Sequence, residues 1–519
     1  MEDEIVEEKQ TTNVSSDNNT TKSIKGESVK SNFIFNLIIQ LLTYIIPLIT
    51  APYLSRVLTP AGVGINSYVH SNVSYFTLVI AFGFTTYGTR KISYIRDDKR
   101  RRTNAFWEIF TTRLLLFIAC LAVYLGVTLT WSFGNSDYKI YYLVYILALV
   151  SCFLDITYLF QGLEKFRIVS IINIVSRVLA AVCYFLFVKT SDDLIKYILI
   201  FSIQSVVIAL VCWVFATRYI SKPKFKEMHV WDCMKNGFIY FLPTIAISVY
   251  TLLDKTMLGA LTDTTEVGYY EQAYKIISLC TALVNAISPI MLSRITYLIG
   301  QGKEDEVEHK IVQMTEIYAL MAWPMVMGLY AVGRYFYPAF FGDEYVPSVY
   351  VGYILLPLIL IIPISNQIGS AYYVPRNRNK IITVFFVVGA LTNFATNWIF
   401  IPLLGAKGAA ITSLLAETII SSLFIIFSWK HINYKKIILM SLKPILSSLI
   451  MFGVLMLLNY FVLDKYISNL IVKTIISVGV GVIIYCLSVL IMREEMVMDT
   501  LKKIIGKLFK RKGSESNDK

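Results

Sequence analysis

The sequence has few charged residues for its length. Asp, Glu, Lys and Arg make up 16% of the 519 residues, against about 25% in a typical soluble protein. Hydrophobic residues make up 56%, and the mean hydropathy is +0.61. The 26 glycines and 14 prolines are too few for a collagen-like or low-complexity chain. The composition therefore indicates an integral membrane protein.

The sequence also lacks the residue patterns of catalytic and metal centres. Its seven cysteines and four histidines are scattered, without the paired spacing of a zinc site or disulfide framework. There is no Gly-x-x-x-x-Gly-Lys-Ser/Thr sequence, which argues against ATP hydrolysis by the chain itself. We therefore expect no catalytic residue, metal or organic cofactor. The net charge of +13 lies between apolar blocks, which indicates membrane topology rather than nucleic-acid binding.

Long apolar segments recur along the chain, and about 20 such residues form a helix that crosses a bilayer. We predict an all-α membrane protein with fourteen spans, at approximately 33–54, 68–88, 109–131, 140–161, 168–188, 194–216, 236–259, 269–292, 314–337, 349–371, 381–404, 408–429, 437–461 and 469–491. The polar residues 1–32 are interpreted as a disordered cytosolic tail, and the basic residues 492–519 as a second one.

The basic residues alternate between the connections. The two tails and the loops after even-numbered spans hold 35 of the 48 Lys and Arg residues, and the loops after odd-numbered spans hold 5. Basic loops are retained in the cytoplasm, so this bias predicts that both termini are cytosolic. We therefore expect the chain to cross a membrane, in contact with membrane lipids, with both tails on its cytoplasmic side.

One short segment is partly repeated. Leu58-Thr-Pro-Ala-Gly-Val-Gly precedes the second span, and Leu261-Thr-Asp-Thr-Thr-Glu-Val-Gly precedes the eighth. An offset of six spans gives the repeats the same membrane orientation, as in transporters built from parallel repeats. We therefore predict an N-lobe at 33–216, a cytosolic linker at 217–235, a C-lobe at 236–429 and two further helices at 430–491.

Several runs resemble a known family. They are Ala51-Pro-Tyr-Leu-Ser-Arg-Val-Leu58 with Tyr87-Gly-Thr-Arg90, Leu154-Asp155 with Phe160-Gln-Gly-Leu-Glu-Lys165, and Leu253-Asp-Lys-Thr-Met-Leu-Gly259 with Val267-Gly-Tyr-Tyr270. The chain resembles the bacterial polysaccharide transporters, which are oligosaccharide flippases of the multidrug, oligosaccharidyl-lipid and polysaccharide exporter superfamily. The resemblance covers nearly all of residues 33–491. It implies a two-lobed bundle, similar to multidrug exporters of that superfamily, around a central cavity.

The same resemblance implies an activity. Members turn an undecaprenyl-pyrophosphate-linked oligosaccharide from the inner to the outer leaflet by alternating access, for the synthesis of capsule, exopolysaccharide or another surface polysaccharide. The resemblance also implies a location in the bacterial cytoplasmic membrane, and a polysaccharide polymerase and assembly proteins are the implied partners. Two alternatives remain: a cation-coupled multidrug antiporter of the same superfamily, and a membrane polysaccharide polymerase or glycosyltransferase. The energy source is open among Na⁺, H⁺, membrane potential and consumption of the cargo.

Charged residues inside or at the ends of apolar spans are the candidate sites, because an unpaired charge at mid-bilayer is costly. A pyrophosphate needs cationic partners in a wet cavity. The candidate substrate contacts are Arg177, Lys275, Lys255, Arg56 and Arg90. The candidates for gating or ion coupling are Glu417, Asp155, Asp254 and Glu271. For Arg177 and for the charges of the seventh and eighth spans, the alternative is a purely structural ion pair. For Glu417 and Asp155 it is a hydrogen-bonded packing carboxylate, and for the span-end arginines it is an extension to the lipid headgroups. Glu417 could also pair with Arg177 in one conformation.

Overall fold

The computed structural model describes residues 29–130, 133, 135–222, 228–494 and 496–498, and all regular secondary structure in these residues is helical. This confirms the predicted all-α class. Most of the two predicted tails, at 1–28 and 499–519, lies outside the described residues.

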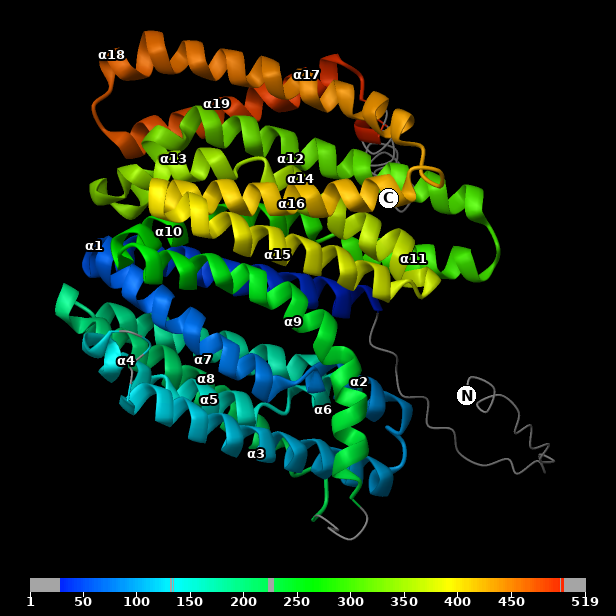
Figure 1. The fold of residues 1–519 in the computed structure, drawn as a ribbon. Coiled ribbons are helices and arrows are strands. Elements are labelled where there is room, and N and C mark those ends of the chain that lie inside the picture. The colour runs from blue at the N-terminus through cyan, green and yellow to red at the C-terminus, as the bar shows by residue number, and fades with distance from the viewer. Residues whose placement is uncertain (1–28, 131–132, 134, 223–227, 495, 499–519) are drawn as a thin grey trace, which may run out of the picture.

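The helices run along a common direction and gather in two groups (Figure 1). One group contains α2 (Phe84–Tyr94), α3 (Lys99–Thr130), α4 (Lys139–Val144), α5 (Ile146–Leu154), α6 (Thr157–Gly162), α7 (Phe166–Phe187) and α8 (Leu194–Ala216). The other contains α10 (Thr264–Asn285), α11 (Ser288–Gly300), α12 (Glu304–Phe341), α13 (Val346–Leu355), α14 (Leu358–Ile368), α15 (Asn379–Leu404), α16 (Ala406–Ser428), α17 (Tyr434–Leu458), α18 (Asp464–Tyr466) and α19 (Leu470–Ile491).

Two helices contact both groups. The first, α1 (Val29–Ala81), packs against α7 and α10, and the second, α9 (Val230–Leu261), packs against α3 and α15. The beginning of α9 lies on the first group, where Gly237 is in close contact with the ring of Phe84. The predicted lobe boundaries stay a prediction, and α9 links the two regions that they separate.

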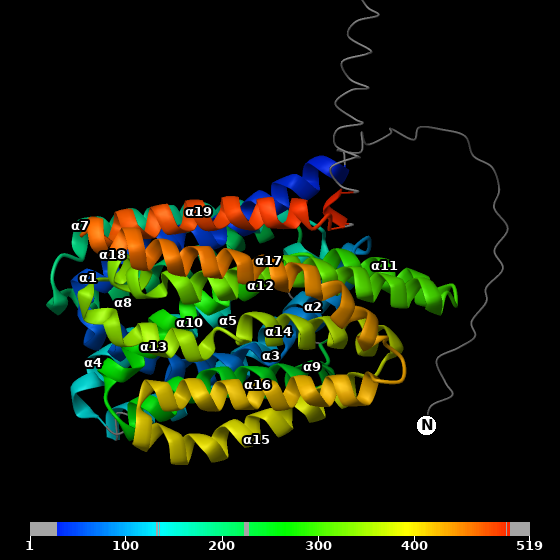
Figure 2. The ribbon, with the colours of Figure 1, turned by 90° about the horizontal axis from the view of Figure 1, so that it is seen from above.

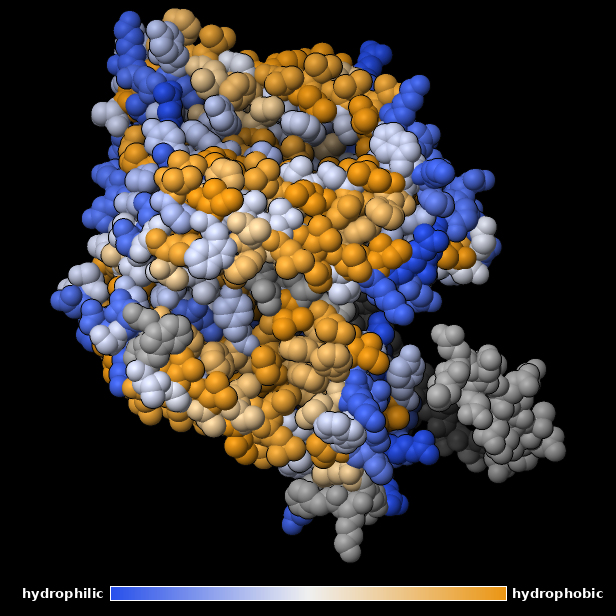
Figure 3. Space-filling model, viewed as in Figure 1, coloured by the Kyte–Doolittle hydropathy of each residue, from blue (hydrophilic) through white to orange (hydrophobic). Residues whose placement is uncertain are grey.

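Apolar side chains cover the outside of the bundle. Figure 3 shows a hydrophobic band across the middle of the molecule with hydrophilic residues at both ends. Leu403 and Ile491, for example, are 73% and 80% exposed. A surface of this kind is stable only where lipid covers it, because large exposed apolar areas are unfavourable in water. The protein is therefore a multi-pass membrane protein.

Nine helices of the described part are long and apolar enough to span a membrane, or up to ten if the bent pair α13–α14 forms one span. The predicted count of fourteen is not confirmed by this test. One predicted span, 194–216, coincides with α8. Others are broken: 140–161 is divided among α4, α5 and α6, and 349–371 bends by 43° between α13 and α14.

The first two predicted spans need a correction. The sequence suggested a connection at Leu58–Tyr68, but the chain is helical there apart from a break at Thr59, where φ is 60°. Proline is tolerated in the first turn of a helix, so Pro60 starts the second segment rather than ending it. The next break, at Phe82 and Gly83 with φ of 42° and 69°, falls inside the predicted span 68–88.

The second copy of the repeated segment also begins a helix. Asp263 precedes α10, and its Oδ1 accepts hydrogen bonds from the backbone N–H groups of Thr265 and Glu266 at 2.7 and 3.1 Å. An aspartate at this position satisfies amides that have no partner within the helix. The cap therefore fixes where α10 starts, next to the end of α9.

The two ends of the bundle differ. At one end, here called the kink end, lie the break at Thr59, α4, α13 and α18; at the other, called the α2 end, lie α2, α6 and α11 (Figures 1 and 2). At the α2 end Asp98 caps α3, and the backbone N–H groups of Arg101 and Arg100 lower the pKa of its carboxyl. The basic segment between α2 and α3, predicted to be cytosolic, lies at this end.

Candidate functional site

The two copies of the repeated segment pack directly against each other at the kink end. A methyl group at Gly64 would lie 1.6 Å from the carbonyl oxygen of Thr264, and one at Gly268 would lie 2.1 Å from the carbonyl oxygen of Pro60. Both distances are far below van der Waals contact. Only glycine permits this approach of α1 to α10, and the contact brings the polar faces of the two helices together.

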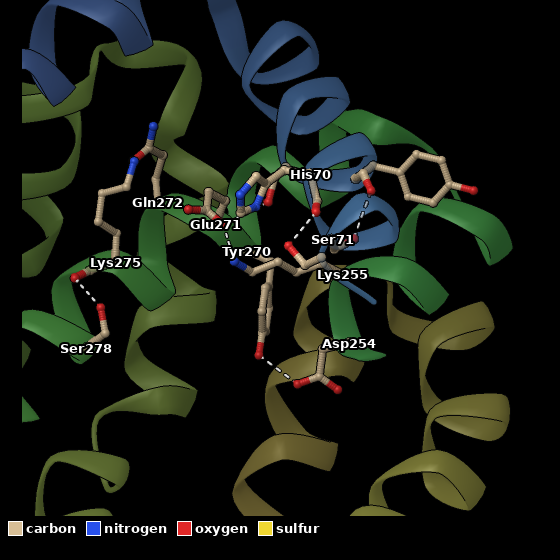
Figure 4. Close-up of polar contacts among 12 residues, drawn as sticks. His70, Ser71, Asp254, Lys255, Tyr270, Glu271, Gln272, Lys275 and Ser278 are labelled. Carbon is tan, nitrogen blue, oxygen red and sulfur yellow. Dashed lines mark hydrogen bonds and ion pairs between the residues drawn. The ribbon is translucent and has the colours of Figure 1, made fainter. Parts of the chain in front are cut away.

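A charged cluster lies beside this contact (Figure 4). Lys255 of α9 pairs with Glu271 of α10, with Nζ 2.6 Å from Oε2, and both side chains are about one-fifth exposed. Ser67 of α1 donates a second hydrogen bond to the same carboxylate at 2.8 Å. Glu271 thus joins three helices. This confirms neither a gate nor a substrate contact, but it places two candidate residues in one ion pair.

Lys275 does not form the ion pair that its spacing from Glu271 suggests. The two residues are four apart and share a helix face. However, Nζ of Lys275 donates to Oε1 of Gln272 at 2.9 Å, while Glu271 pairs with Lys255. Gln272 in turn donates to the hydroxyl of Ser55 on α1 at 2.8 Å. Lys275 therefore contributes positive charge to the surface of α10 that faces α1.

Asp254 lies one residue before Lys255 but in a separate environment. It is 3% exposed, and its carboxylate accepts hydrogen bonds from Tyr270 at 2.8 Å, Asn393 at 2.8 Å and Asn397 at 2.9 Å, and from Ser413. These donors come from α10, α15 and α16 and are all neutral. The four hydrogen bonds stabilise the charged carboxylate by dipoles alone.

Glu417 shares this region. It is 5% exposed on α16 and lines a small space of about 20 Å³ with Asp254, Tyr270 and Tyr274. The sequence left open a pairing of Glu417 with Arg177. The structure places the two residues in different cavities.

A cavity between α1, α7, α8 and α10 contains the other central candidates. One compartment, of about 490 Å³, is lined by Arg177 and Asn173 of α7 and by Asp155. An adjoining compartment of about 240 Å³ is lined by Glu271, Gln272 and Lys275 of α10. Both compartments are lined by the same residues of α1 and α8: Pro47, Thr50, Leu54, Tyr197 and Phe201. Arg177 and Lys275 thus line adjoining parts of one polar cavity.

Asp155 has a structural role in addition. It occupies the break between α5 and α6, and its Oδ1 accepts the backbone N–H of Thr157 at 2.9 Å, which starts α6. The buried Arg113 donates to the backbone carbonyl of Asp155, and its guanidinium lies 5.8 Å from the ring centre of Tyr158. Asp155 therefore shapes the cavity wall as well as lining it.

The two span-end arginines lie at opposite ends of the bundle. Arg56 is at the kink end and donates to the carbonyl oxygen of Ala339 on α12. Arg90 is at the α2 end, 5.5 Å from the ring centre of Tyr240 on α9 and 3.4 Å from its hydroxyl. Both side chains are exposed, and neither lines the two compartments described above.

Some residues of this region were not among the predicted candidates. His70, Gln272, Tyr197 and Phe201 line the cavity, and Arg113 supports its wall. Arg113 could have been found, because it is an arginine inside an apolar helix. The aromatic residues could not, because the chain has 34 tyrosines and 31 phenylalanines and their spacing does not distinguish cavity from core.

Comparison with known proteins gives the family. Residues 29–291 match the family described as "Polysaccharide biosynthesis protein". The chain belongs to this family. The predicted resemblance to polysaccharide transporters is thereby confirmed.

The chain is similar to the putative O-antigen transporter of Escherichia coli (strain K12), with 26% identity over 405 residues that cover 77% of this chain and 96% of the relative. It is also similar to the teichuronic acid biosynthesis protein TuaB of Bacillus subtilis (strain 168), with 23% identity over 290 residues that cover 53% of this chain and 57% of TuaB.

Solved structures show the same fold. The lipid II flippase MurJ in its inward closed conformation superposes with a TM-score of 0.73 at 16% identity, covering 89% of this chain and 100% of MurJ. An inward-facing multidrug resistance transporter of the MATE family and the MOP superfamily superposes with a TM-score of 0.55 at 13% identity, covering 76% of this chain and 98% of that one. At these identities the likeness describes the fold alone.

Proposed function

We propose that this protein is a flippase for an undecaprenyl-pyrophosphate-linked oligosaccharide, which it turns from the inner to the outer leaflet of the bacterial cytoplasmic membrane by alternating access. The product feeds the synthesis of capsule, exopolysaccharide or another surface polysaccharide, where a polymerase and assembly proteins take it up. Both termini are cytosolic, so the α2 end faces the cytoplasm. The family and the names of the relatives support this assignment.

The observation that supports the proposal most is a cavity between α1, α7, α8 and α10 that two basic residues line. A phosphate that crosses about 30 Å of hydrocarbon must exchange its water for polar protein groups. Arg177 and Lys275 line adjoining compartments of this cavity, together with the acidic residues Asp155 and Glu271. In the proposed mechanism Arg177 binds the pyrophosphate, since a guanidinium matches the geometry of phosphate oxygens. The polyprenyl chain stays in the lipid.

The ion pair between Lys255 and Glu271 is the proposed gate. It joins α9 to α10, and the hydrogen bond from Ser67 extends the contact to α1 at the kink end. In the proposed cycle this contact is broken when the cavity opens to the outer leaflet and re-forms when it opens to the inner one. Arg56 and Arg90 contact the cargo at the outer and inner mouths.

Asp254 is the proposed coupling residue, with Glu417 next to it. A carboxylate that is buried among neutral donors loses its charge on protonation or shares it with a small cation such as Na⁺. Either event changes the charge balance next to the Lys255–Glu271 pair.

A cell-based experiment tests the function. In a strain that lacks this protein, lipid-linked oligosaccharide should accumulate on the inner leaflet, and surface polysaccharide should be lost until the wild-type chain is restored. A multidrug antiporter is the second candidate, because the buried acidic pair Asp254 and Glu417 suits a cationic cargo. Drug sensitivity with normal surface polysaccharide would favour it and would contradict the flippase.

A further inference from the structure

Two aromatic residues separate the compartments of the cavity. Tyr197 and Phe201 lie four residues apart on α8 and so share one helix face. Both line the compartment of Arg177 and also the compartment of Lys275. Each ring is partly exposed, whereas neighbouring Tyr145 is fully buried. Part of each ring surface therefore faces cavity space rather than protein.

These rings are fixed by their neighbours. The ring centre of Phe201 lies 5.7 Å from that of His70 and 6.5 Å from that of Tyr145. Tyr145 donates to Oδ1 of Asn66 at 2.8 Å, which fixes its orientation, and Tyr197 lies 5.1 Å from Tyr184 of α7. Aromatic contacts from α1, from Tyr145 at the junction of α4 and α5, and from α7 thus hold the pair in place without covering it.

The polar groups around the pair are of the kinds that bind hydroxyl groups. On one side lie Gln272, Lys275 and Asn66, and on the other lie Asn173 and Gln204. A sugar ring has an apolar C–H face and hydroxyl groups around its edge. Ligand sites of about 300–1,000 Å³ commonly combine aromatic walls with a few polar groups in this way.

We propose that Tyr197 and Phe201 form a sugar subsite, in which a pyranose ring of the cargo packs on the aromatic faces while Asn66 and Lys275 bind its hydroxyl groups. This proposal rests on the proposed flippase function and adds that different residues bind the phosphate and the sugar of the cargo. Arg177 binds the phosphate, which every cargo shares, and the aromatic pair selects the sugar.

The test uses purified protein in lipid vesicles and two probes: undecaprenyl pyrophosphate that carries an oligosaccharide, and undecaprenyl pyrophosphate without sugar. The measured quantity is the ratio of their flipping rates. Tyr197→Leu and Phe201→Leu should lower this ratio about two- to twelve-fold each, since an aromatic contact contributes about 0.5–1.5 kcal/mol beyond its buried area. Tyr197→Phe, which retains the ring, should keep the ratio within about two-fold of wild type.

Tyr460→Leu and Phe461→Leu provide matched controls, because these residues are 72% and 60% exposed on the surface of η8 (Asn459–Leu463). They should leave the ratio unchanged. If a Leu variant fails to insert, the milder Phe201→Met gives the same comparison. An unchanged ratio in the variants of α8, with wild type flipping both probes, overturns the subsite alone. If wild type flips neither probe, both the subsite and the proposed function are wrong.

Discussion

Ser67 and Glu271 are joined by a direct hydrogen bond of 2.8 Å. They follow the two copies of the repeated segment at equivalent positions, each three residues after the last glycine of its copy. Gly64 and Gly268 are related by the same offset in sequence, as are Pro60 and Thr264. Each glycine lies against the backbone of the other copy. Equivalent residues that touch each other lie close to an axis of local two-fold symmetry, so these contacts are the expected consequence of parallel repeats.

The glycine contacts make the kink end sensitive to a single methyl group. Gly64→Ala and Gly268→Ala should each lower the free energy of unfolding by about 1–3 kcal/mol, since the methyl group meets rigid backbone. The measurement is the Tm of the detergent-solubilised protein. Gly453→Ala on α17 is the matched control, because no atom lies within 4 Å of the added methyl. Equal Tm values for the three variants would refute the tight contact.

The Lys255–Glu271 pair should behave as a partly buried ion pair. Removing one partner, as in Lys255→Met or Glu271→Gln, should destabilise the protein by an amount between the value of about 1 kcal/mol for an exposed pair and that of about 3–5 kcal/mol for a fully buried one. The double variant should lose less than the sum of the two. A double-mutant cycle on unfolding in denaturant measures the coupling. Strictly additive losses would show that the pair contributes no direct interaction.

One carboxylate contributes to the attachment of the C-terminal helices α17 and α19 to α12, in addition to the packing of these helices on α12. Asp464 accepts from Arg334 at 2.7 Å, from Tyr335 at 2.6 Å and from Lys473 at 3.2 Å. Asp464→Asn should destabilise this attachment by about 1 kcal/mol, because the carboxylate is one-third exposed and partly screened. Hydrogen exchange in α17 and α19 should increase, while exchange in α3 should not. Uniform exchange across both regions would contradict a local attachment.

Asp254 should control how transport depends on an ion gradient. Asp254→Asn keeps the size of the side chain but removes the charge that four neutral donors surround. Flipping in vesicles under an imposed Na⁺ or proton gradient should then become independent of that gradient, while wild type responds to one of the two. A variant that responds as wild type does would exclude Asp254 as the coupling residue.

The sequence predicted the helical class and several spans because apolar length is a local property. The segment 194–216 is predominantly apolar and is one helix, α8. The segment Leu58–Tyr68 resembles a connection in sequence because Pro60, Gly62 and Gly64 are typical of turns. In the structure Gly64 and the carbonyl of Pro60 lie directly against α10, and such long-range contacts cannot be predicted from local composition.

The charged candidates could be identified from the sequence because a charge inside an apolar span is also a local feature. Their hydrogen-bond and ion-pair partners could not be identified, because these depend on how neighbouring helices pack. Glu271 pairs with Lys255 rather than with Lys275, which shares its helix face. Arg90 lies against Tyr240, which is 150 residues away in sequence. The aromatic wall of the cavity gave no signal of its own, because tyrosine and phenylalanine are common throughout the chain.

Vesicle flipping of an undecaprenyl-pyrophosphate-linked oligosaccharide by wild type and Arg177→Ala tests the central claim most directly. Wild-type vesicles should expose the lipid-linked sugar to an external glycosidase well above the level of protein-free vesicles. Arg177→Ala, inserted to the same level, should flip at least about ten-fold more slowly, because a hydrogen bond to a charged group contributes about 1.5–3 kcal/mol. Wild-type vesicles that match protein-free ones, or an Arg177→Ala rate equal to wild type, would contradict the account.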